Sequence, residues 1–335
     1  MPGRVRIGVI GCGAIARYTH FRGYAQLTDE VEVVALADPF RENLNLLGDM
    51  HNIPTDSRYV SYEDLLARDD IDAVSICTPN YLHGPQTVDA LQAGKHVLCE
   101  KPMATTVETA MAMVEAAEDT GKILMVGFTH RYMKHNQVTK QLLDEGAIGK
   151  PFMIRVRFAH DGPYKSWVAT TDWFFRPEKA GGGALLDMGI HALDICRYML
   201  GEITTVSGQL GTFGKDIVVE DTAVINLSFG DHALGYIETG WSSKEGVSGL
   251  EIYGTEGSIV VDYVTPIRIF RAATRKWEEI TDAKNDAAVA EMHHFVECIK
   301  SGKQPLTSGE DGLISVQLAA AVYESARTGC VIYLD

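Results

Sequence analysis

The 335-residue sequence lacks the features that mark several protein classes. It has no apolar run close to the roughly 18 residues of a membrane-spanning helix, so no membrane partner is expected. Basic residues are few: 30 Lys and Arg stand against 45 Asp and Glu, which gives a formal net charge of −15. Because an acidic surface repels phosphate backbones, nucleic acid is not an expected partner either. The remaining composition, with 46% hydrophobic and 22% charged residues, is typical of a globular protein.

The six cysteines are scattered, and no two of them form a Cys-x-x-Cys pair. They are Cys12, Cys77, Cys99, Cys196, Cys298 and Cys330. A metal site built from thiolates is therefore not expected, and no metal is predicted. A disulfide framework is not indicated, and the chain starts with a predicted strand instead of a signal peptide. We therefore expect a protein of the reducing cytoplasm.

The first 127 residues alternate short apolar runs with helical patterns. Strands are predicted at residues 5–10, 31–37, 71–77, 96–99 and 123–127, and helices at 14–27, 40–50, 81–93 and 107–120. The runs are rich in Val and Ile and apolar almost throughout, which is typical of parallel strands covered on both faces. We therefore predict an α/β domain over residues 1–127, with a doubly wound parallel sheet of the Rossmann type.

After residue 127 the pattern changes to short β-like runs separated by turns. A helix is predicted at 136–145 and a strand ending near residue 159, followed by runs at 206–211, 222–229, 234–238, 249–253, 258–262 and 267–270. Several runs have hairpin spacing. Two helices, at about 287–300 and 311–328, follow. Residues 128–335 are thus predicted to form an α+β domain with a mainly antiparallel sheet, whose last helices we expect to pack back on the first domain.

A glycine motif of the form Gly-x-Gly-x-x-Ala directly follows the first strand. It comprises Gly11, Cys12, Gly13, Ala14, Ile15 and Ala16. Gly11 allows the tight turn from strand to helix, and Gly13 lets the backbone approach a pyrophosphate at the helix N-terminus. Alone, this pattern could mark only a tight turn, but its position between a strand and a helix favours dinucleotide binding.

The second predicted strand ends at Asp38, where a ribose partner is expected. A carboxylate there accepts hydrogen bonds from the ribose hydroxyls and repels a 2′-phosphate, so NAD is favoured over NADP. Arg41 lies close enough in the sequence to weaken this preference; alternatively, it is an ordinary solvated helix residue.

Polar residues follow two more of the predicted strands. One strand continues into Thr78, Pro79, Asn80 and His83, and the next continues into Glu100, Lys101 and Pro102. Open α/β sheets bind their ligands at this edge. Lys101 there could hydrogen-bond a reacting oxygen and stabilise an alkoxide, or it could be a surface lysine. His83 by itself is more typical of a helix face than of a catalyst.

Three glycines, Gly181 to Gly183, precede a helical pattern in the second domain. Asp187 and His191 are spaced i, i+4 on this pattern and share one face. Such a pair suits a carboxylate that orients an imidazole, which then accepts a substrate proton near neutral pH. Asp194, about one turn further on, could support the histidine from behind. The alternatives are a surface ion pair, a core histidine or part of a metal site, although no third ligand is evident nearby.

Taken together, these motifs resemble the glucose–fructose oxidoreductase/inositol dehydrogenase/rhizopine-catabolism (Gfo/Idh/MocA) family. The similarity rests on the glycine motif, Asp38, the Glu100-Lys101-Pro102 motif and the glycine loop before Asp187 and His191. It continues through Gly127-Phe128, Arg131-Tyr132, Gly149-Lys150-Pro151 and the segment 307–312, and so covers almost the whole chain.

The resemblance implies a Rossmann domain that binds NAD, followed by a domain with a large open sheet that binds substrate and forms homodimers or homotetramers. It assigns the catalytic set to Lys101, Asp187 and His191. It places around the nicotinamide and its ribose the residues Thr78, Pro79, Asn80, His83, Glu100 and Lys101. It places His160 near the hydroxyls of a sugar. Trp173 and Arg176 precede the glycine loop and could cover the pocket, although the aromatic run 173–175 could equally be core.

One segment departs from the common family pattern. Residues 128–132 are Phe-Thr-His-Arg-Tyr, where many relatives have an Asn or Arg pair before an aromatic residue. This segment helps to shape the substrate pocket in the family, so the substrate of a relative does not transfer directly to this chain. His130, Arg131 and Tyr132 are therefore candidate pocket residues.

The residues and the resemblance together predict NAD(P)-dependent oxidation of a secondary alcohol on a sugar, polyol or sugar derivative. In this hypothesis His191 removes the hydroxyl proton, Lys101 holds the substrate oxygen and Asp187 orients His191. Two alternatives stay open: an NAD-dependent glycoside hydrolase or lyase with no net redox change, and a non-enzymatic nucleotide-sensing regulator. The intact catalytic set argues against the regulator.

Overall fold

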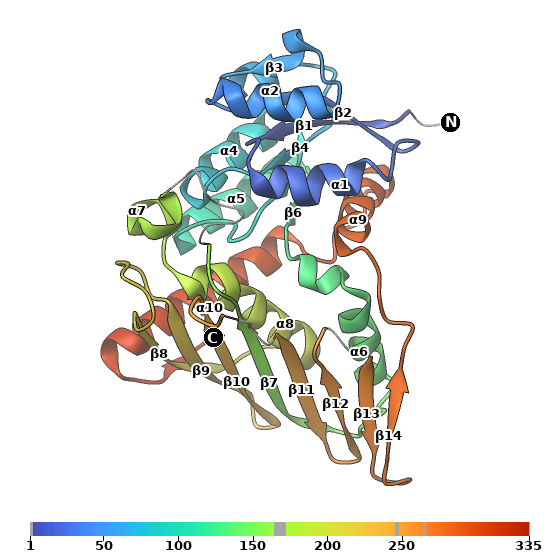
Figure 1. The fold of residues 1–335 in the computed structure, drawn as a ribbon, viewed down its shortest axis with the longest axis vertical. Helices are drawn as coiled ribbons and strands as arrows, with labels where there is room; N and C mark the ends of the chain where they lie inside the picture. Colours follow the sequence, from blue (N-terminus) through green and yellow to red (C-terminus); the bar gives the residue numbers. More distant parts are fainter. Residues whose placement is uncertain (1–2, 164–171, 245–247, 264–265, 335) are drawn as a thin grey trace. The chain divides into compact units, whose positions relative to one another are not determined.

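The computed structural model describes residues 3–163, 172–244, 248–263 and 266–334 (Figure 1). The chain divides into two compact units. Unit 1 comprises residues 1–129 and 286–314, and unit 2 comprises residues 130–285 and 315–335. The chain therefore completes unit 1 only after it has passed through the sheet of unit 2.

Unit 1 contains a six-stranded sheet in which all neighbouring strands are parallel. In spatial order the strands are β3 (Arg58–Tyr59), β2 (Val31–Ala37), β1 (Val5–Ile10), β4 (Ala73–Ile76), β5 (His96–Cys99) and β6 (Leu124–Val126). All residues of β4 are buried, as expected for a strand covered on both faces. The predicted Rossmann-type sheet is confirmed, while the two-residue strand β3 has no counterpart in the prediction.

Helices connect and cover the strands of unit 1. They are the π-helical turn η1 (Ala16–His20) with its continuation α1 (Phe21–Tyr24), α2 (Arg41–Met50), the 3-10 turn η2 (Thr55–Ser57), α3 (Tyr62–Leu66), α4 (Asn80–Gln92), α5 (Val107–Thr120) and α9 (Ala287–Ser301). α9 packs on α1, although the sheet of unit 2 lies between them in the sequence. The Val126 N–H donates to the Thr307 carbonyl at 2.9 Å, so the segment after α9 borders the edge strand β6.

Unit 2 contains a nine-stranded mixed sheet (Figure 1). In spatial order the strands are β14 (Lys276–Ile280), β13 (Ile267–Arg271), β12 (Gly257–Val261), β11 (Gly249–Gly254), β7 (Pro151–Ala159), β10 (Ala233–Gly240), β9 (Thr222–Phe229), β8 (Thr205–Gly211) and β15 (Ile332–Tyr333). β7 and β10 run parallel, and the other neighbouring pairs are antiparallel. The predicted mainly antiparallel sheet is confirmed, and β14 and β15 extend it at both edges beyond the prediction.

Helices cover one face of this sheet. The helical elements are η3 (Thr129–Tyr132), α6 (Lys134–Asp144), η4 (Trp173–Phe175), α7 (Pro177–Ala180), the π-helical turn η5 (Leu185–Gly189), α8 (Ile190–Leu200) and α10 (Gly309–Thr328). α8 packs on β7 and β10, and α6 packs on α8. Val156, Phe158 and Ile237 point from the strands into this core and are fully buried. No helix within the described residues has the length and hydrophobicity needed to cross a membrane.

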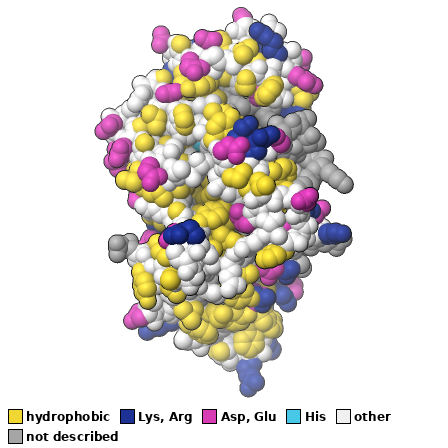
Figure 2. All heavy atoms as spheres, turned by 90° about the vertical axis from the view of Figure 1, so that its left-hand side faces the viewer, with side chains coloured by type: hydrophobic (Ala, Val, Ile, Leu, Met, Phe, Trp, Pro, Cys, Tyr) yellow, Lys and Arg dark blue, Asp and Glu magenta, His cyan; other side chains and the backbone are white. Residues whose placement is uncertain are grey.

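The opposite face of the sheet carries exposed apolar and charged side chains. Val224 on β9 and Leu234 on β10 are 44% and 61% exposed. On the same face, Arg157 forms an ion pair with Glu238 at 3.2 Å. Figure 2 shows hydrophobic side chains gathered on the surface of unit 2, in the lower part of the view.

Candidate active site

The turn after β1 contains two glycines with different roles. Gly11 has φ +92°, a conformation that other residues rarely adopt, and a Cβ there would lie 2.7 Å from the Cys77 carbonyl. A Cβ at Gly13 would meet no atom within 4 Å. The fold therefore requires glycine at position 11, whereas at position 13 it leaves open space. A bound pyrophosphate needs such a space beside the backbone, just before Ala14 and Ile15 open the helix.

Asp38 lies directly beside this turn. Its carboxylate accepts from the Cys12 N–H at 2.8 Å and from the Phe40 N–H at 2.8 Å, and the residue is 6% exposed. The Asn43 side-chain amide also lies 3.4 Å from both carboxylate oxygens. A carboxylate has about four acceptor positions, and ribose hydroxyls can replace these two long contacts. Arg41, the first residue of α2, is exposed. The structure thus holds the predicted ribose partner against the glycine turn.

His83 joins the two polar segments that follow β4 and β5. It is buried on α4, and its ring nitrogens lie 2.7 Å from the Thr78 carbonyl oxygen and 2.8 Å from the Pro102 carbonyl oxygen. Burial lowers the pKa of His83, and a neutral imidazole donates to one of these oxygens. His83 therefore ties together the segments that carry Asn80 and Lys101.

Behind the end of β5, Glu100 forms a buried pair with His20. Glu100 Oε1 lies 3.0 Å from His20 Nε2, and the second carboxylate oxygen accepts from the Lys101 backbone N–H at 3.2 Å. Burial opposes the ionisation of Glu100, but the hydrogen bond and charge of His20 and the charge of Lys101 hold its pKa below the usual value. An ionised carboxylate thus stands beside the predicted catalytic lysine.

A second buried acid, Glu291, comes from α9. Its Oε2 accepts from the Thr129 hydroxyl at 2.8 Å, and its Oε1 has no hydrogen-bond partner among the described residues. Burial and the charge of Glu100 raise the pKa of Glu291 well above its usual value. The surroundings of Glu291 therefore favour its neutral form, whereas those of Glu100 favour the ionised carboxylate.

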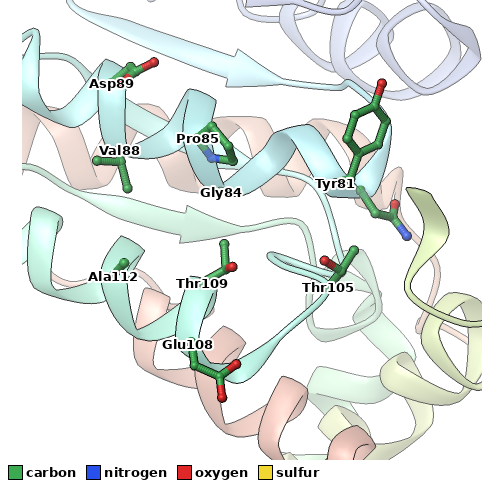
Figure 3. Close-up of a pocket in the computed structure, with 10 residues that line it drawn as sticks. Tyr81, Gly84, Pro85, Val88, Asp89, Thr105, Glu108, Thr109 and Ala112 are labelled. Atoms are coloured by element: carbon green, nitrogen blue, oxygen red, sulfur yellow. The ribbon is translucent and has the colours of Figure 1, made fainter. Parts of the chain in front are cut away.

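A cavity of 460 Å³ lies between α4 and α5 (Figure 3). Its lining combines apolar side chains such as Val88 with the carboxylates of Asp89 and Glu108. Of the predicted cofactor residues in the described part of the chain, Asn80 alone lines it. The cavity is therefore lined by a different set of residues from the glycine turn and the Lys101 segment.

In unit 2 the triple-glycine loop is pressed against two other segments. A Cβ at Gly182 would collide with the Tyr323 hydroxyl, and one at Gly183 would collide with the Glu220 carbonyl oxygen. The Glu220 side chain caps the start of the helix. Its Oε1 accepts from the Gly183 N–H at 2.9 Å, the Leu185 N–H at 3.0 Å and the Tyr323 hydroxyl at 2.8 Å. Close approach thus explains the glycines that precede η5.

Asp187 and His191 lie on one continuous helical segment, the first in η5 and the second in α8. They are 8% and 7% exposed. The indole N–H of Trp241, the residue after β10, donates to Asp187 Oδ2 at 2.9 Å. The pair is therefore buried, which excludes the surface ion pair that the sequence left open.

His160, directly after β7, faces the same carboxylate. Its Nε2 lies 3.9 Å from Asp187 Oδ2, and its Nδ1 accepts from the Gly162 N–H at 2.7 Å. Because a neutral imidazole carries one proton, this hydrogen bond assigns the proton to Nε2. His160 thus presents an N–H toward Asp187, and its side chain is 33% exposed.

Arg131 and Asp194, both predicted from the sequence, are paired with each other. Arg131 donates to the two carboxylate oxygens at 2.9 and 2.6 Å, and both residues are buried. The guanidinium also lies 5.2 Å from the centre of the Tyr198 ring. Tyr132, the next residue, is buried as well. Each charge of the pair thus compensates the other inside unit 2.

The aromatic run before the glycine loop is half-buried. Trp173 stacks on Phe174 with ring centres 3.8 Å apart, and Phe174 and Phe175 pack against a cluster that includes Trp241. Arg176 is exposed and donates to Asp172 at 2.6 Å. Phe174 and Phe175 therefore belong partly to the core, and Trp173 stacks on Phe174.

Four residues at these sites were missed by sequence reasoning: His20, Glu220, Trp241 and Glu291. Glu291 has a usable signal, because it shares a helix face with Ala288, Met292 and Phe295, where an acid is unusual. The others have no spacing that links them to Asp187 or Glu100 along the sequence.

Comparison with known proteins agrees with this architecture. Residues 5–128 match the family described as "Oxidoreductase family, NAD-binding Rossmann fold", and residues 136–260 match "GFO/IDH/MocA C-terminal domain". The chain is 30% identical over 350 residues to scyllo-inositol 2-dehydrogenase (NAD(+)) of Bacillus subtilis (strain 168), covering 100% of this chain and 98% of that protein. The chain belongs to the GFO/IDH/MocA oxidoreductase family.

Solved structures share the fold over almost the whole length of this family member. Aldose-aldose oxidoreductase from Caulobacter crescentus, complexed with glycerol, has a TM-score of 0.88 at 29% identity and covers 99% of this chain and 100% of that one. Levoglucosan dehydrogenase in complex with NADH has a TM-score of 0.91 at 25% identity, with 99% of each chain covered. The predicted family and enzyme class are confirmed, since the relatives are named sugar and polyol dehydrogenases.

The predicted NAD cofactor is also confirmed by the NAD-binding family and its NADH-bound structural neighbour. The residues of unit 1 fit this cofactor. The open space at Gly13 admits a pyrophosphate, and the Asp38 carboxylate beside it has acceptor positions for a ribose.

Proposed function

We propose that this enzyme oxidises a secondary alcohol of a sugar, polyol or sugar derivative with NAD. The observation that carries the proposal is the buried pair of Asp187 and His191, in which Asp187 is held by the Trp241 indole at 2.9 Å. A carboxylate fixed in this way can orient an imidazole for proton transfer, and alcohol oxidation requires such a transfer.

The catalytic residues have distinct roles in this proposal. When bound, NAD supplies the acceptor for the hydride that leaves the substrate carbon. His191 accepts the hydroxyl proton, and Asp187 stabilises the resulting imidazolium. Lys101 donates a hydrogen bond to the substrate oxygen and stabilises its negative charge. The ionised Glu100 lies beside this lysine, and its carboxylate accepts from the Lys101 backbone N–H at 3.2 Å.

The cofactor is proposed to follow the edge of the unit 1 sheet. Its pyrophosphate would lie on the turn from Gly11 to Ile15, and its nicotinamide end would meet Thr78, Pro79, Asn80, His83, Glu100 and Lys101. Asp38 would bind the adenosine ribose and repel a 2′-phosphate, so NAD is preferred to NADP.

The substrate class is proposed from the relatives and from unit 2. Scyllo-inositol 2-dehydrogenase and levoglucosan dehydrogenase are named for a polyol and an anhydrosugar. In this chain His160 offers an N–H for a hydroxyl group, and the Trp173 ring offers a flat apolar surface for a sugar ring. Arg176 completes the proposed substrate set, whereas the Arg131 guanidinium is buried and donates to Asp194.

The test is NADH formation with NAD⁺, and separately with NADP⁺, against a panel of free sugars, inositols, glycosides and anhydrosugars. Lys101→Met is expected to bind NAD⁺ normally in calorimetry and to lose most of its turnover. Lys303→Met, at an exposed lysine between α9 and α10, is the matched control and is expected to keep full activity. Retained turnover in Lys101→Met would remove Lys101 from the mechanism. Glycoside cleavage without NADH formation would instead identify the alternative, an NAD-dependent glycoside hydrolase or lyase with no net redox change.

The uncovered face of the nine-stranded sheet supports a homodimer or homotetramer as the working form. Exposed Val224 and Leu234 lie there beside the Arg157–Glu238 ion pair. Leu234→Glu is expected to shift the protein toward monomer in sedimentation velocity. The six cysteines are free thiols, which suits the cytoplasm as the proposed compartment.

A further inference from the structure

His130 lies in the segment whose sequence departs from the family pattern, and its side chain stacks on His191. The ring centres are 4.4 Å apart, and the planes are 15° from parallel. Both residues belong to unit 2. We propose that His130 is a positioning residue for His191 and that the stacked pair takes up one proton beyond the two neutral imidazoles before it takes up a second. The inference rests on the proposed role of His191 as the base.

Two further aromatic rings hold His130 in place. Phe158 on β7 contacts it edge-on, with ring centres 4.6 Å apart and an interplanar angle of 67°. Tyr263 lies on another side, with ring centres 6.0 Å apart, and its hydroxyl is hydrogen-bonded by the Asn136 side chain at 3.3 Å. A ring fixed in this way packs the His191 imidazole from one side, so His191 turns only if the cluster is displaced.

The stacked geometry also restricts charge. One protonated imidazole over a neutral one is favourable, because a cation then faces a π-system. Two protonated rings at this separation repel each other. The pair therefore takes up its first proton readily and its second only at lower pH, and the two steps belong to the pair and not to either ring. The singly protonated pair is the state that forms when His191 accepts the hydroxyl proton.

Among the groups of the described residues considered below, Asp187 is the charge that selects the site of this proton. Asp194 on α8 is compensated by Arg131 from η3, and His160, directly after β7, faces Asp187. On α6, burial and the charge of Lys284 lower the pKa of His135 to about 4. Burial raises the pKa of Tyr263, which follows β12. β10 contributes the uncharged Ile237 and Thr239 to this side. Asp187, four residues before His191, therefore draws the proton to His191.

An NMR titration of the histidine ring signals in the full chain, without substrate, tests the shared proton. His130→Phe and His191→Phe assign the two signals. Because Asp187 draws the first proton to His191, we expect the His191 signal to shift mainly in the first step and the His130 signal mainly in a second step, more than about one pH unit lower. In His191→Phe, the remaining His130 is expected to take up its proton above the pH of that second step.

Independent titration of the two rings, each with the midpoint seen in the single variants, would overturn the shared proton. His135→Phe is the matched control, because His135 packs on Tyr263, one ring away, with centres 4.4 Å apart. This variant is expected to leave the titration of His191 unchanged.

Kinetics test the positioning role separately. His130→Ala is expected to lower kcat roughly ten- to hundredfold with little change in the KM for NAD, because the base is no longer held in place. His130→Phe, which keeps a ring in the stack, is expected to recover most of this loss above the pH at which His191 is protonated. A Phe variant as slow as the Ala variant would refute positioning by stacking. The NMR titration needs no turnover, so its result stands apart from that of Lys101→Met.

Discussion

Trp241 and Asp187 share a buried hydrogen bond of 2.9 Å between the indole N–H and a carboxylate oxygen. Trp241 is 1% exposed, and Phe175 contacts its ring edge-on with centres 6.3 Å apart. An indole has one donor and no acceptor, so the bond has a single direction. The carboxylate in the proposed catalytic set is therefore oriented by a residue 54 positions away in the sequence.

Trp241→Phe removes this donor and keeps an aromatic ring. A hydrogen bond to a charged group contributes about 1.5–3 kcal/mol, so kcat is expected to fall roughly ten- to hundredfold. Steady-state kinetics with NAD⁺ and the substrate found in the panel measure the change. Trp277→Phe, at a half-exposed tryptophan on β14, is the control and should behave like the unsubstituted enzyme. An unchanged kcat in Trp241→Phe would show that other contacts suffice to hold Asp187.

Alanine substitutions at the two glycines of the first turn are expected to have different effects, one on NAD⁺ binding and the other on stability. Gly13→Ala adds a methyl group in open space, so the free energy of unfolding should change by less than about 1 kcal/mol. The same methyl group would occupy the space for the pyrophosphate, so the Kd for NAD⁺ should rise at least about tenfold. Gly11→Ala, with φ +92° and a close carbonyl, should lose roughly 1–3 kcal/mol of stability. Urea unfolding and calorimetry separate the two outcomes, and normal NAD⁺ binding by Gly13→Ala would contradict the assignment.

Glu291 is expected to make stability depend on pH. Its pKa is raised in the folded state, so between about pH 4.3, the value for an unfolded Glu, and the raised pKa the folded state binds more protons. The free energy of unfolding therefore falls as the pH rises through this window, by up to roughly 1.4 kcal/mol per pH unit.

Glu291→Gln, which resembles the protonated acid, should flatten this dependence in urea unfolding at a series of pH values. Glu297→Gln, at an exposed glutamate on the same helix, is the control and should leave the slope unchanged. The same slope in Glu291→Gln as in the unsubstituted protein would show that another group binds the extra proton.

Glu220 is expected to stabilise the start of the helix that carries Asp187. Glu220→Ala removes one oxygen that accepts three hydrogen bonds, so the free energy of unfolding should fall by about 1–3 kcal/mol. Glu220→Gln keeps an acceptor oxygen and should recover at least half of that loss. Equal losses in the two variants, measured by urea unfolding, would mean that the negative charge matters and not the acceptor geometry.

The parallel sheet of unit 1 was predictable because burial on both faces leaves continuous apolar runs in the sequence. The two-residue strands β3 and β15 are too short to leave any period. The parallel pairing of β7 with β10 was not predictable either. Alternation along a strand reports which side chains are buried and does not report the direction of the neighbouring strand.

Some residues of the candidate site could be predicted from the sequence and others could not. Gly11, Gly13 and Asp38 were predictable because they belong to a local motif that also forms the turn. Asp187 and His191 lie four residues apart on one helical segment, so their spacing was visible in the sequence. Trp241, directly after β10, and Glu220, just before β9, contact the same helix, and no short-range sequence pattern connects them to it.

The division of unit 1 into two stretches of sequence has a consequence for biosynthesis. Residues 1–129 leave the ribosome well before α9, which packs on α1 and supplies the partner of the Thr129 hydroxyl. Throughout the translation of the intervening sheet, the nascent nucleotide-binding unit exposes the apolar surface that α9 later covers. Long-range contacts of this kind slow folding and expose unfinished surface to aggregation. The nucleotide-binding unit of this enzyme is therefore completed only after α9 has been synthesised. We expect the nascent chain that lacks α9 to depend on chaperones more than the finished protein does.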